Sequence, residues 1–317
     1  MTGRPAAPRL ESLPGTSSRV LVVGEALVDV VAGEGAPAAY PGGSPLNVAV
    51  GLARLGLRVS LHTSLGDDEY GHLIEEHLDA ADVDLTEALD PEIATSVAEA
   101  TIRGDGSADY RFQLAWDPAE LDPRAGRFDA VHTGSIGAAL EPGAGLVESI
   151  LVTHRQSATI SFDPNVRPQL MGSPATAVPR AEKFVALADV VKASREDVAW
   201  LYPGVAVPDV VRRWLALGAG VVVVTGAESG ASAASASGAV HVDASPTMVA
   251  DTIGAGDSFM AGLITALDER DLLGGDRRDA LTNVDTVTLT DIVGFAARCA
   301  AITVSRPGAD PPWRSEL

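Results

Sequence analysis

The sequence predicts an α/β fold, with helices on both faces of a central, mainly parallel β-sheet and a small β lid. Three observations lead to this prediction. Short β-branched segments such as Arg19–Gly24 and Val221–Thr225 are typical of buried strands. Segments of helical length separate these strands, and recurrent strand–helix alternation is typical of a parallel sheet covered by helices. With 317 residues, 46% of them hydrophobic, the chain is long enough to bury a large core.

The predicted elements follow residues 1–17, which are rich in Pro, Gly and Ser and are expected to form a frayed tail. After the first strand, further strands are expected at Arg58–Ser64, Phe128–His132, Thr159–Phe162, Val190–Lys192 and Val221–Thr225. Helices are expected at Pro45–Leu55, Glu69–Ala80, Ala144–His154, Ala181–Leu187, Pro208–Leu217, Phe259–Leu267 and Ala296–Arg306. The first of these helices is followed by Gly56, a residue type that commonly ends helices.

Two hairpins interrupt this alternation. The strand-like segments Ser96–Arg103 and Ala108–Leu114 are joined by Gly-Asp-Gly-Ser at 104–107, and a second pair is expected at Ala231–Ser235 and Ala239–Val242. The first hairpin, together with Val30–Tyr40, can form a small β appendage near residues 30–41 and 95–115. Such an appendage is either a lid over a site or an ordinary edge hairpin.

The composition excludes several classes of protein. The 23 Lys and Arg against 43 Asp and Glu give a formal net charge of −20, which argues against a nucleic-acid partner. No apolar run approaches the ~18 residues of a membrane span, and the first residues lack the apolar core of a secretory signal. We therefore expect a cytoplasmic protein with no membrane partner. The lone Cys299 excludes an internal disulfide framework, and neither lysine, Lys183 or Lys192, follows a glycine, which excludes a Walker A loop.

The string Asp251–Phe259 (DTIGAGDSF) is the most informative motif. The small-residue turn at 254–256 opens an apolar run typical of a helix. Glycines let the backbone approach a ligand, and the unpaired first amides of a helix can bind phosphate. Asp257 lies beside these amides, where it can accept a proton from an attacking hydroxyl or simply interact with the helix dipole. A base next to an anion hole suits phosphoryl transfer.

Two further motifs carry polar residues at candidate ligand positions. In Tyr40–Ala49 (YPGGSPLNVA), two glycines precede a helix start, and Asn47 is polar in an otherwise apolar turn. Its carboxamide can face a polyhydroxyl ligand or make a local backbone hydrogen bond. In Gly24–Asp29 (GEALVD), Asp29 follows the first strand, at the sheet end where α/β proteins bind ligands. Asp29 can accept hydrogen bonds from sugar hydroxyls or cap a turn.

The two glycine-rich strings resemble the two signatures of the ribokinase-like (PfkB-type) carbohydrate kinases. The resemblance extends from about Val20 to the C-terminus and implies one kinase domain over residues 18–317, with the ribokinase-like three-layer sandwich. It is closest to bacterial fructokinases in Gly24–Asp29, in His132–Ser135 and in Asp163–Pro168. Family members often dimerise through the β lid, so a homodimer is also implied.

The resemblance implies roles for individual residues. Asp257 resembles the base that deprotonates a primary hydroxyl of the sugar. The anion hole for the transferring γ-phosphate corresponds to Gly254, Ala255 and Gly256. The implied sugar-binding residues are Asp29, Gly42, Gly43 and Asn47. Asn165 and Arg167 match a further pair on the substrate side or the phosphate side, and the motif does not decide between the two. The implied cofactors are ATP and Mg²⁺.

The nucleotide and metal motifs depart from the family pattern. The family's Asn-x-x-Glu motif, which organises Mg²⁺ and phosphate through water, corresponds to Ser194 and Asp197, which can equally form a helix cap. In the nucleotide loop, Gly226 aligns but the second glycine is displaced by one place. The implied nucleotide-binding residues are Ser194, Thr225, Gly226, Gly230 and Gly256. Backbone groups near Asp251, Ile253 and Gly308 are implied to bind a monovalent cation such as K⁺.

These motifs together predict an ATP-dependent sugar kinase that phosphorylates a primary hydroxyl of a ketose, with fructose converted to fructose 6-phosphate. The nearest alternatives are the same chemistry on 2-keto-3-deoxygluconate, ribose or a nucleoside. Arg167 and Arg111, on the predicted hairpin, can serve a substrate carboxylate. An alternative of another class is a non-catalytic sugar-binding protein on the same fold. A dinucleotide oxidoreductase ranks below these because no G-x-G-x-x-G follows the first strand.

Overall fold

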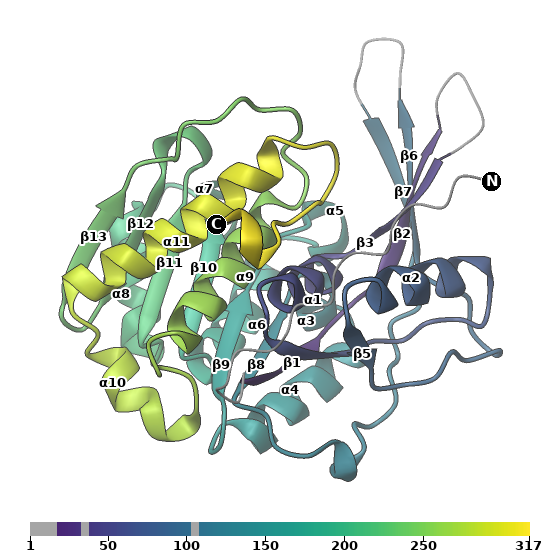
Figure 1. Ribbon diagram of the computed structural model, residues 1–317, viewed down its shortest axis with the longest axis horizontal. Coiled ribbons are helices and arrows are strands. Elements are labelled where there is room, and N and C mark those ends of the chain that lie inside the picture. The colour runs from purple at the N-terminus through teal and green to yellow at the C-terminus, as the bar shows by residue number, and fades with distance from the viewer. Residues whose placement is uncertain (1–17, 33–37, 103–107) are drawn as a thin grey trace.

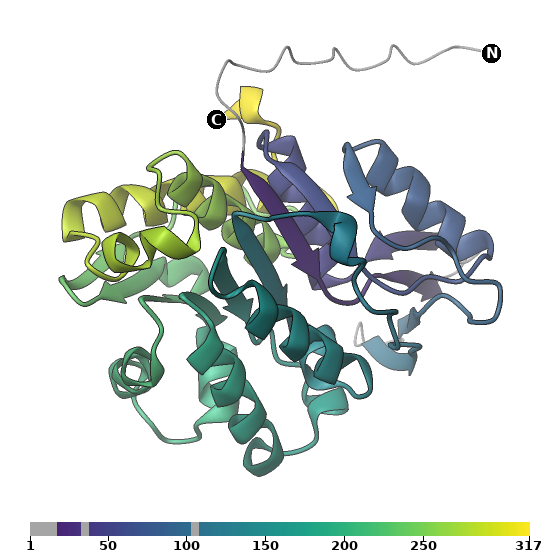
Figure 2. The ribbon, with the colours of Figure 1, turned by 90° about the horizontal axis from the view of Figure 1, so that it is seen from below.

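The computed structural model describes residues 18–32, 38–102 and 108–317 (Figure 1). The predicted tail at 1–17 and the hairpin turn at 104–107 lie outside the described residues. Within them, the predicted α/β architecture is confirmed. A large, mainly parallel sheet lies between two layers of helices, and a small second sheet projects from one end (Figures 1 and 2).

The large sheet has nine strands in the order β13-β12-β11-β10-β9-β8-β1-β4-β5. Their bounds are β1 Arg19–Val23, β4 Arg58–His62, β5 Val83–Leu85, β8 Ala130–Gly134, β9 Thr159–Asp163, β10 Val190–Ser194, β11 Val221–Thr225, β12 Ala231–Ser235 and β13 Gly238–Val242. All neighbours from β5 to β11 pair in parallel, whereas β12 and β13 are antiparallel. The carboxyl ends of the parallel strands therefore meet along one edge, where open α/β sheets bind ligands.

The helices divide between the two faces of this sheet. One face carries α1 Ser44–Arg54, α2 Glu69–Asp79, α9 Ala255–Asp268, α10 Arg278–Thr282 and α11 Thr286–Val304. The other face carries α3 Ser135–Ala139, α4 Gly143–His154, α6 Pro174–Leu187, α7 Arg195–Leu201 and α8 Val207–Leu217. β1 shows why both layers form: Val20 and Val22 lie in one core, while Leu21 and Val23 lie in the other. The β-strand period of two thus supplies apolar side chains to both faces.

The second sheet confirms the predicted β appendage. Its four strands, in the order β3-β2-β6-β7, are β2 Leu27–Ala32, β3 Ala38–Gly42, β6 Val97–Ile102 and β7 Ala108–Gln113. They form a sheet separate from the large one, so the first hairpin is not an edge of the central sheet. A small apolar cluster of Leu27, Ala98 and Ile136 attaches this sheet to α3, and Leu170 of the short helix α5 (Pro168–Met171) packs against it.

Three predicted helices begin at least four residues earlier than their apolar runs indicated. The helix expected from Phe259 begins at Ala255, because Gly254 adopts the left-handed conformation (φ 72°, ψ 0°) that starts it. The helix expected from Ala181 begins at Pro174, a residue suited to a first helical position. The helix expected from Ala296 begins at Thr286 and is capped by Asp285. In α11 the first turns are rich in threonine, so the apolar pattern there was too weak to detect.

Helix α11 also corrects the prediction about apolar segments. Over 18 residues its mean hydropathy reaches 1.5, so by length and composition it is long and apolar enough to cross a membrane. Hydroxyl and small residues interrupt its apolar runs, which is why no continuous run was found. In the fold, 44% of that window is buried, with Leu289, Ile292 and Phe295 among the buried residues of the core. We therefore assign α11 to the core of the domain.

Candidate functional site

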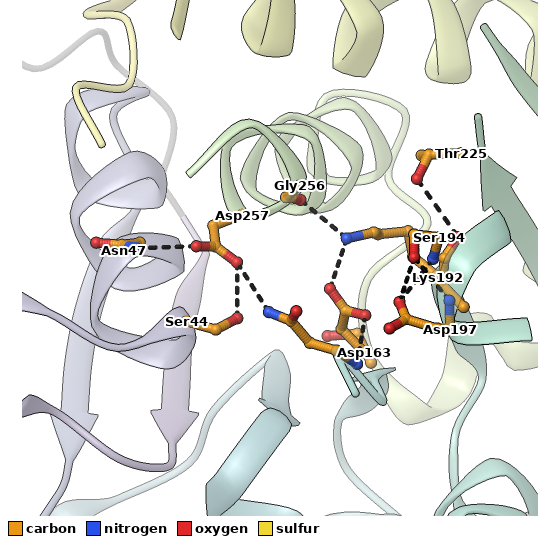
Figure 3. A network of polar contacts seen from close by, with 12 residues as sticks. Ser44, Asn47, Asp163, Lys192, Ser194, Asp197, Thr225, Gly256 and Asp257 are labelled. Atoms are coloured by element: carbon orange, nitrogen blue, oxygen red, sulfur yellow. Dashed lines mark hydrogen bonds and ion pairs between the residues drawn. The ribbon is translucent and has the colours of Figure 1, made fainter. Parts of the chain in front are cut away.

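The predicted site residues meet at the carboxyl edge of the large sheet. The N-termini of α1, α7 and α9 converge there on the ends of β9, β10 and β11 (Figure 3). Segments more than 200 residues apart in sequence contact each other directly, as Ser44 and Asp257 do. The site is therefore a product of the strand order.

The turn that begins α9 presents unpaired amides. Gly254 is the N-cap residue, and the backbone amides of Gly256 and Asp257 have no hydrogen-bond partner within the described part of the chain. A Cβ built on Gly254 would lie 2.6 Å from the Cβ of Ala309, so no other residue fits there without displacing the C-terminal loop. Gly254, Ala255 and Gly256 are half-exposed. This geometry, with the positive end of a 14-residue helix, suits an anion.

The carboxylate of Asp257 accepts hydrogen bonds from two other elements. Asp257 is 7% exposed, in the first turn of α9. Its Oδ1 accepts from the Ser44 hydroxyl at 2.7 Å and from Asn165 Nδ2 at 3.4 Å, and its Oδ2 accepts from Asn47 Nδ2 at 2.9 Å. The structure thus brings Asn47 and Asn165 to the predicted base. Ser44 was not predicted as a site residue, although it stands between Gly43 and Asn47 in the same motif.

Gly42 and Gly43 leave space for neighbouring groups at the start of α1. A Cβ on Gly42 would lie 2.2 Å from Oδ2 of Asp29, so the absence of a side chain lets that carboxylate lie against the backbone. Gly43 is the N-cap of α1 with φ 104°, and a Cβ there would lie 2.7 Å from the carbonyl oxygen of Glu25. Asp29 itself comes from β2, so the small sheet contributes a carboxylate to the site.

Arg167 lies on the side of the site that holds Asp29. Its Nη1 donates to Oδ1 of Asn165 at 2.7 Å, and Asn165 adopts an unusual positive φ of 34°. Burial raises the pKa of Asp29, and the nearby Arg167 guanidinium opposes that rise. Arg167 acts in the same direction on the buried Glu25. The guanidinium of Arg167 is therefore close enough to act on both carboxylates. Its assignment to the substrate side or the phosphate side stays a prediction.

A buried ion pair lies beneath the α9 turn, and sequence reasoning did not select it. Lys192 Nζ donates to Oδ2 of Asp163 at 2.6 Å and to the carbonyl oxygen of Gly256 at 3.1 Å (Figure 3). Asp163 ends β9 and is the first residue of the motif Asp163–Pro168, and Lys192 lies in the middle of β10, two residues before Ser194. The available signal was a lysine within a β-branched strand, in a chain that has only two lysines.

Ser194 and Asp197 form a helix cap at the start of α7, which the sequence allowed as the alternative to a Mg²⁺ motif. Oδ2 of Asp197 accepts from the Ser194 amide at 2.9 Å and hydroxyl at 2.7 Å, and Oδ1 accepts from the Val166 amide at 2.8 Å. Both carboxylate oxygens thus have partners inside the protein. Thr225 pairs in register with Ser194, which brings these two predicted nucleotide-side residues together at the ends of β10 and β11.

The predicted nucleotide loop is a tight turn after β11. The Gly226 amide donates to the carbonyl of Gly230 at 2.7 Å, which closes a short 3₁₀ segment, Ala227–Ser229. Gly230 has φ 76°, and a Cβ there would lie 2.1 Å from the carbonyl oxygen of Val242. The displaced second glycine therefore serves the turn into β12.

The side chain of Asp251 joins the α9 turn to the C-terminal loop. Its Oδ2 accepts from the Gly308 amide at 2.8 Å and its Oδ1 from the Ile253 amide at 3.0 Å. Burial opposes ionisation, but these hydrogen bonds together lower the pKa of Asp251. The three residues predicted around a monovalent cation thus lie next to each other.

The donor groups decide which cofactors the site can hold. In residues 18–32, 38–102 and 108–317, no cluster of three or more His, Cys, Asp or Glu side chains could hold a metal ion. Mg²⁺ bound together with a nucleotide is commonly held by phosphate oxygens, water and one or two carboxylates. The unpaired amides of Gly256 and Asp257 fit a phosphate group.

Glu25 offers a pH-dependent test of this geometry. Burial raises its pKa to about 7, and the hydrogen bond from the Gly137 amide at 2.7 Å opposes that rise. The folded protein therefore holds this proton more tightly than the unfolded chain, and the free energy of unfolding falls as pH rises toward 7. Between pH 5.5 and pH 8.5, the free energy of unfolding is expected to fall by about 2 kcal/mol less in Glu25→Gln than in the wild-type protein.

Urea unfolding at the two pH values measures the effect, with exposed Glu120→Gln as the control that keeps the wild-type pH dependence. An unchanged pH dependence in Glu25→Gln would contradict the assignment.

Comparison with known proteins gives consistent matches. Residues 17–316 match the pattern of the pfkB family carbohydrate kinases. The chain is 32% identical to a fructokinase from Klebsiella pneumoniae over 317 residues, which cover 95% of this chain and 98% of that one. A crystal structure of fructokinase from Xylella fastidiosa with bound ATP has a TM-score of 0.81 and 26% identity, covering 92% of this chain and 93% of the other. A fructokinase double mutant from Vibrio cholerae O395, in a form with bound fructose, ADP and potassium ion, has a TM-score of 0.76 and 27% identity, covering 93% and 94%.

Proposed function

The chain belongs to the pfkB family of carbohydrate kinases, and from this premise we propose that it transfers the γ-phosphoryl group of ATP to a primary hydroxyl of fructose, giving fructose 6-phosphate. One observation carries the proposal. A buried carboxylate, Asp257, lies directly beside the unpaired amides of the α9 turn and is held by Ser44, Asn47 and Asn165. A base and an anion hole on one helix turn are the two groups that phosphoryl transfer requires.

The proposed reaction follows from this arrangement. Oδ of Asp257 takes the proton of the sugar hydroxyl while the hydroxyl oxygen forms a bond to the γ-phosphorus. The bond from that phosphorus to the β,γ-bridging oxygen breaks, and its electron pair leaves with ADP. The amides of Gly256 and Asp257 stabilise the charge on the transferring group. Asn47, Asn165 and Asp29 orient the sugar.

The cofactors are part of the proposal. When bound, Mg²⁺ neutralises charge on the nucleotide phosphates, and this chain would hold it through those phosphates and water. The ATP in the Xylella structure and the potassium ion in the Vibrio structure support ATP and a monovalent cation near Asp251 and Gly308. For the nucleotide, the proposal uses Thr225, which ends β11 opposite Ser194, and the Gly226–Gly230 turn that joins β11 to β12.

Fructose as the substrate rests on the relatives and on one feature of the site. Fructokinases from several organisms match at about 30% identity over most of the chain. The proposal assigns the Asp29 carboxylate and the Arg167 guanidinium, which lie near each other, to the sugar, a set that suits hydroxyl groups. The carboxylate of a substrate such as 2-keto-3-deoxygluconate would be attracted by Arg167 but repelled by the nearby carboxylate of Asp29.

A panel of substrates tests the proposal. Fructose, 2-keto-3-deoxygluconate, ribose and adenosine are each incubated with ATP and Mg²⁺, and ADP release is measured. We expect kcat/KM for fructose to exceed that of each other substrate by at least about tenfold. Phosphorus NMR of the product identifies the phosphorylated hydroxyl, and the Asp257→Asn protein controls for a contaminating kinase.

A higher kcat/KM for another substrate would replace fructose. Sugar binding by calorimetry without any ATP turnover would favour the non-catalytic alternative.

A further inference from the structure

A buried lysine lies where helix stability alone would not place one. The side chain of Lys192 is 4% exposed, and its ammonium contacts the first turn of α9. Burying an ammonium costs free energy, and a cation next to the positive end of a helix interacts unfavourably with its dipole. The only other lysine, Lys183, follows the ordinary pattern: it is exposed on α6 and pairs with Glu148 at 2.6 Å.

The contacts of Lys192 form a closed ring with the predicted base (Figure 3). Its Nζ joins Asp163 to the carbonyl of Gly256. Oδ1 of Asp163 accepts from the Asn165 amide at 3.1 Å, and Asn165 Nδ2 donates to Asp257 at 3.4 Å. Asp257 directly follows Gly256, which closes the ring. Lys192 is therefore connected to Asp257 indirectly in two ways, through Gly256 in the α9 turn and through Asp163 and Asn165 in the loop after β9.

We propose that Lys192 is a positioning residue for phosphoryl transfer, which with Asp163 holds the first turn of α9 against the Asp163–Asn165 loop. This inference rests on the proposed function. The Lys192 ammonium fixes the position of the α9 turn, which carries the free amides, relative to Asn165, which donates to the Asp257 carboxylate. Its charge also offsets the nearby carboxylates of Asp163 and Asp257, which would otherwise repel an incoming phosphate.

The charge state of the ring supports this role. Burial alone would lower the pKa of Lys192, but Asp163, Asp257 and Asp197 together raise it above its ordinary value. Burial raises the pKa of Asp163 to about 6, and Lys192 opposes that rise. The ammonium thus stays charged across the neutral range, as a partner for an anionic substrate must.

An ion pair between a buried carboxylate and a partly exposed guanidinium provides the control. Asp189 directly precedes β10, at the end of the strand away from the site, and is 1% exposed. It accepts from the Ile160 amide at 2.8 Å and from Nη2 of Arg278 at 3.1 Å. Replacing this pair also removes one acidic and one basic charge, at the opposite end of β10, and does not touch α9.

The experiment compares kcat and KM in the wild-type protein, a double variant of the Lys192 pair and a control variant. Lys192→Met leaves the buried Asp163 carboxylate without a counter-charge, so the main test is the double variant Asp163→Asn/Lys192→Met, which removes both charges. The control is Asp189→Asn/Arg278→Met. We expect the double variant to lower kcat about 10²-fold with the KM for fructose changed less than about threefold, and the control to retain kcat. Thermal unfolding of all three shows how much stability each substitution costs.

Nucleotide binding provides a readout that does not depend on turnover. Calorimetry with ATP and with ADP measures the extra affinity due to the γ-phosphate, which the double variant is expected to lose and the control to keep. A double variant whose kcat and ATP/ADP ratio both match those of the control would overturn the role of Lys192. If wild-type protein binds ATP but phosphorylates no sugar, only the substrate proposal fails, and a wild-type protein that binds neither nucleotide overturns both.

Discussion

Asp257→Asn is expected to lower kcat by about 10²–10⁴-fold while the KM for the sugar changes little. An amide has nearly the shape of a carboxylate, so the contacts with Ser44 and Asn47 can re-form once the Asn47 carboxamide turns. The amide cannot accept the proton of the attacking hydroxyl. The effect therefore falls on the chemical step.

Steady-state kinetics and sugar binding by calorimetry measure the two effects separately. Asp268→Asn is the matched control: Asp268 lies in the last turn of the same helix, is half-buried and pairs with Ser18, far along α9 from the site. It is expected to retain the wild-type kcat. Near wild-type turnover in Asp257→Asn would show that another group is the base.

Gly254→Ala is expected to lower kcat/KM by about 10²-fold or more. Gly254 has φ 72°, a conformation that costs a non-glycine residue about 1 kcal/mol, and the added Cβ would lie 2.6 Å from the Cβ of Ala309. The turn and the C-terminal loop must then move apart. Because the amides of Gly256 and Asp257 follow directly, their direction toward the phosphate changes with the turn.

Gly204→Ala separates backbone strain from this collision. Gly204 has nearly the same φ, 78°, but no atom within 4 Å of a built Cβ. Both variants are expected to lose the stability that the left-handed conformation costs, measured by urea unfolding, whereas only Gly254→Ala loses activity. Equal activities in the two variants would argue against an anion-binding role for the α9 turn.

Much of the fold could be predicted because its signals are local. Segments such as Val221–Thr225 are predicted as strands from their β-branched residues. The alternation of strands and helices then permits few topologies. Helix starts were predicted less well. The first turns of α6 and α11 combine capping residues and threonines with few large apolar side chains, so periodicity does not reveal them.

The site was predicted in part for the same reason. Gly254 and Asp257 stand in one continuous string, so their proximity is fixed by the chain. Asp197 is different, because a Ser-x-x-Asp pattern suits both a helix cap and a metal site. Only the amide of Val166, 31 residues away, accounts for its second oxygen and favours the cap.

The sequence by itself therefore determined the α/β class and the adjacency of Gly254–Gly256, the turn proposed to bind an anion, to Asp257, the proposed base, since each depends on neighbours along the chain. The tertiary structure alone decided which groups surround that base. Ser44 lies 213 residues from Asp257, and Lys192 lies 64 residues from Gly256. Their contacts depend on strand order and on burial of charge in a low-dielectric interior, and no local pattern of residues carries that information.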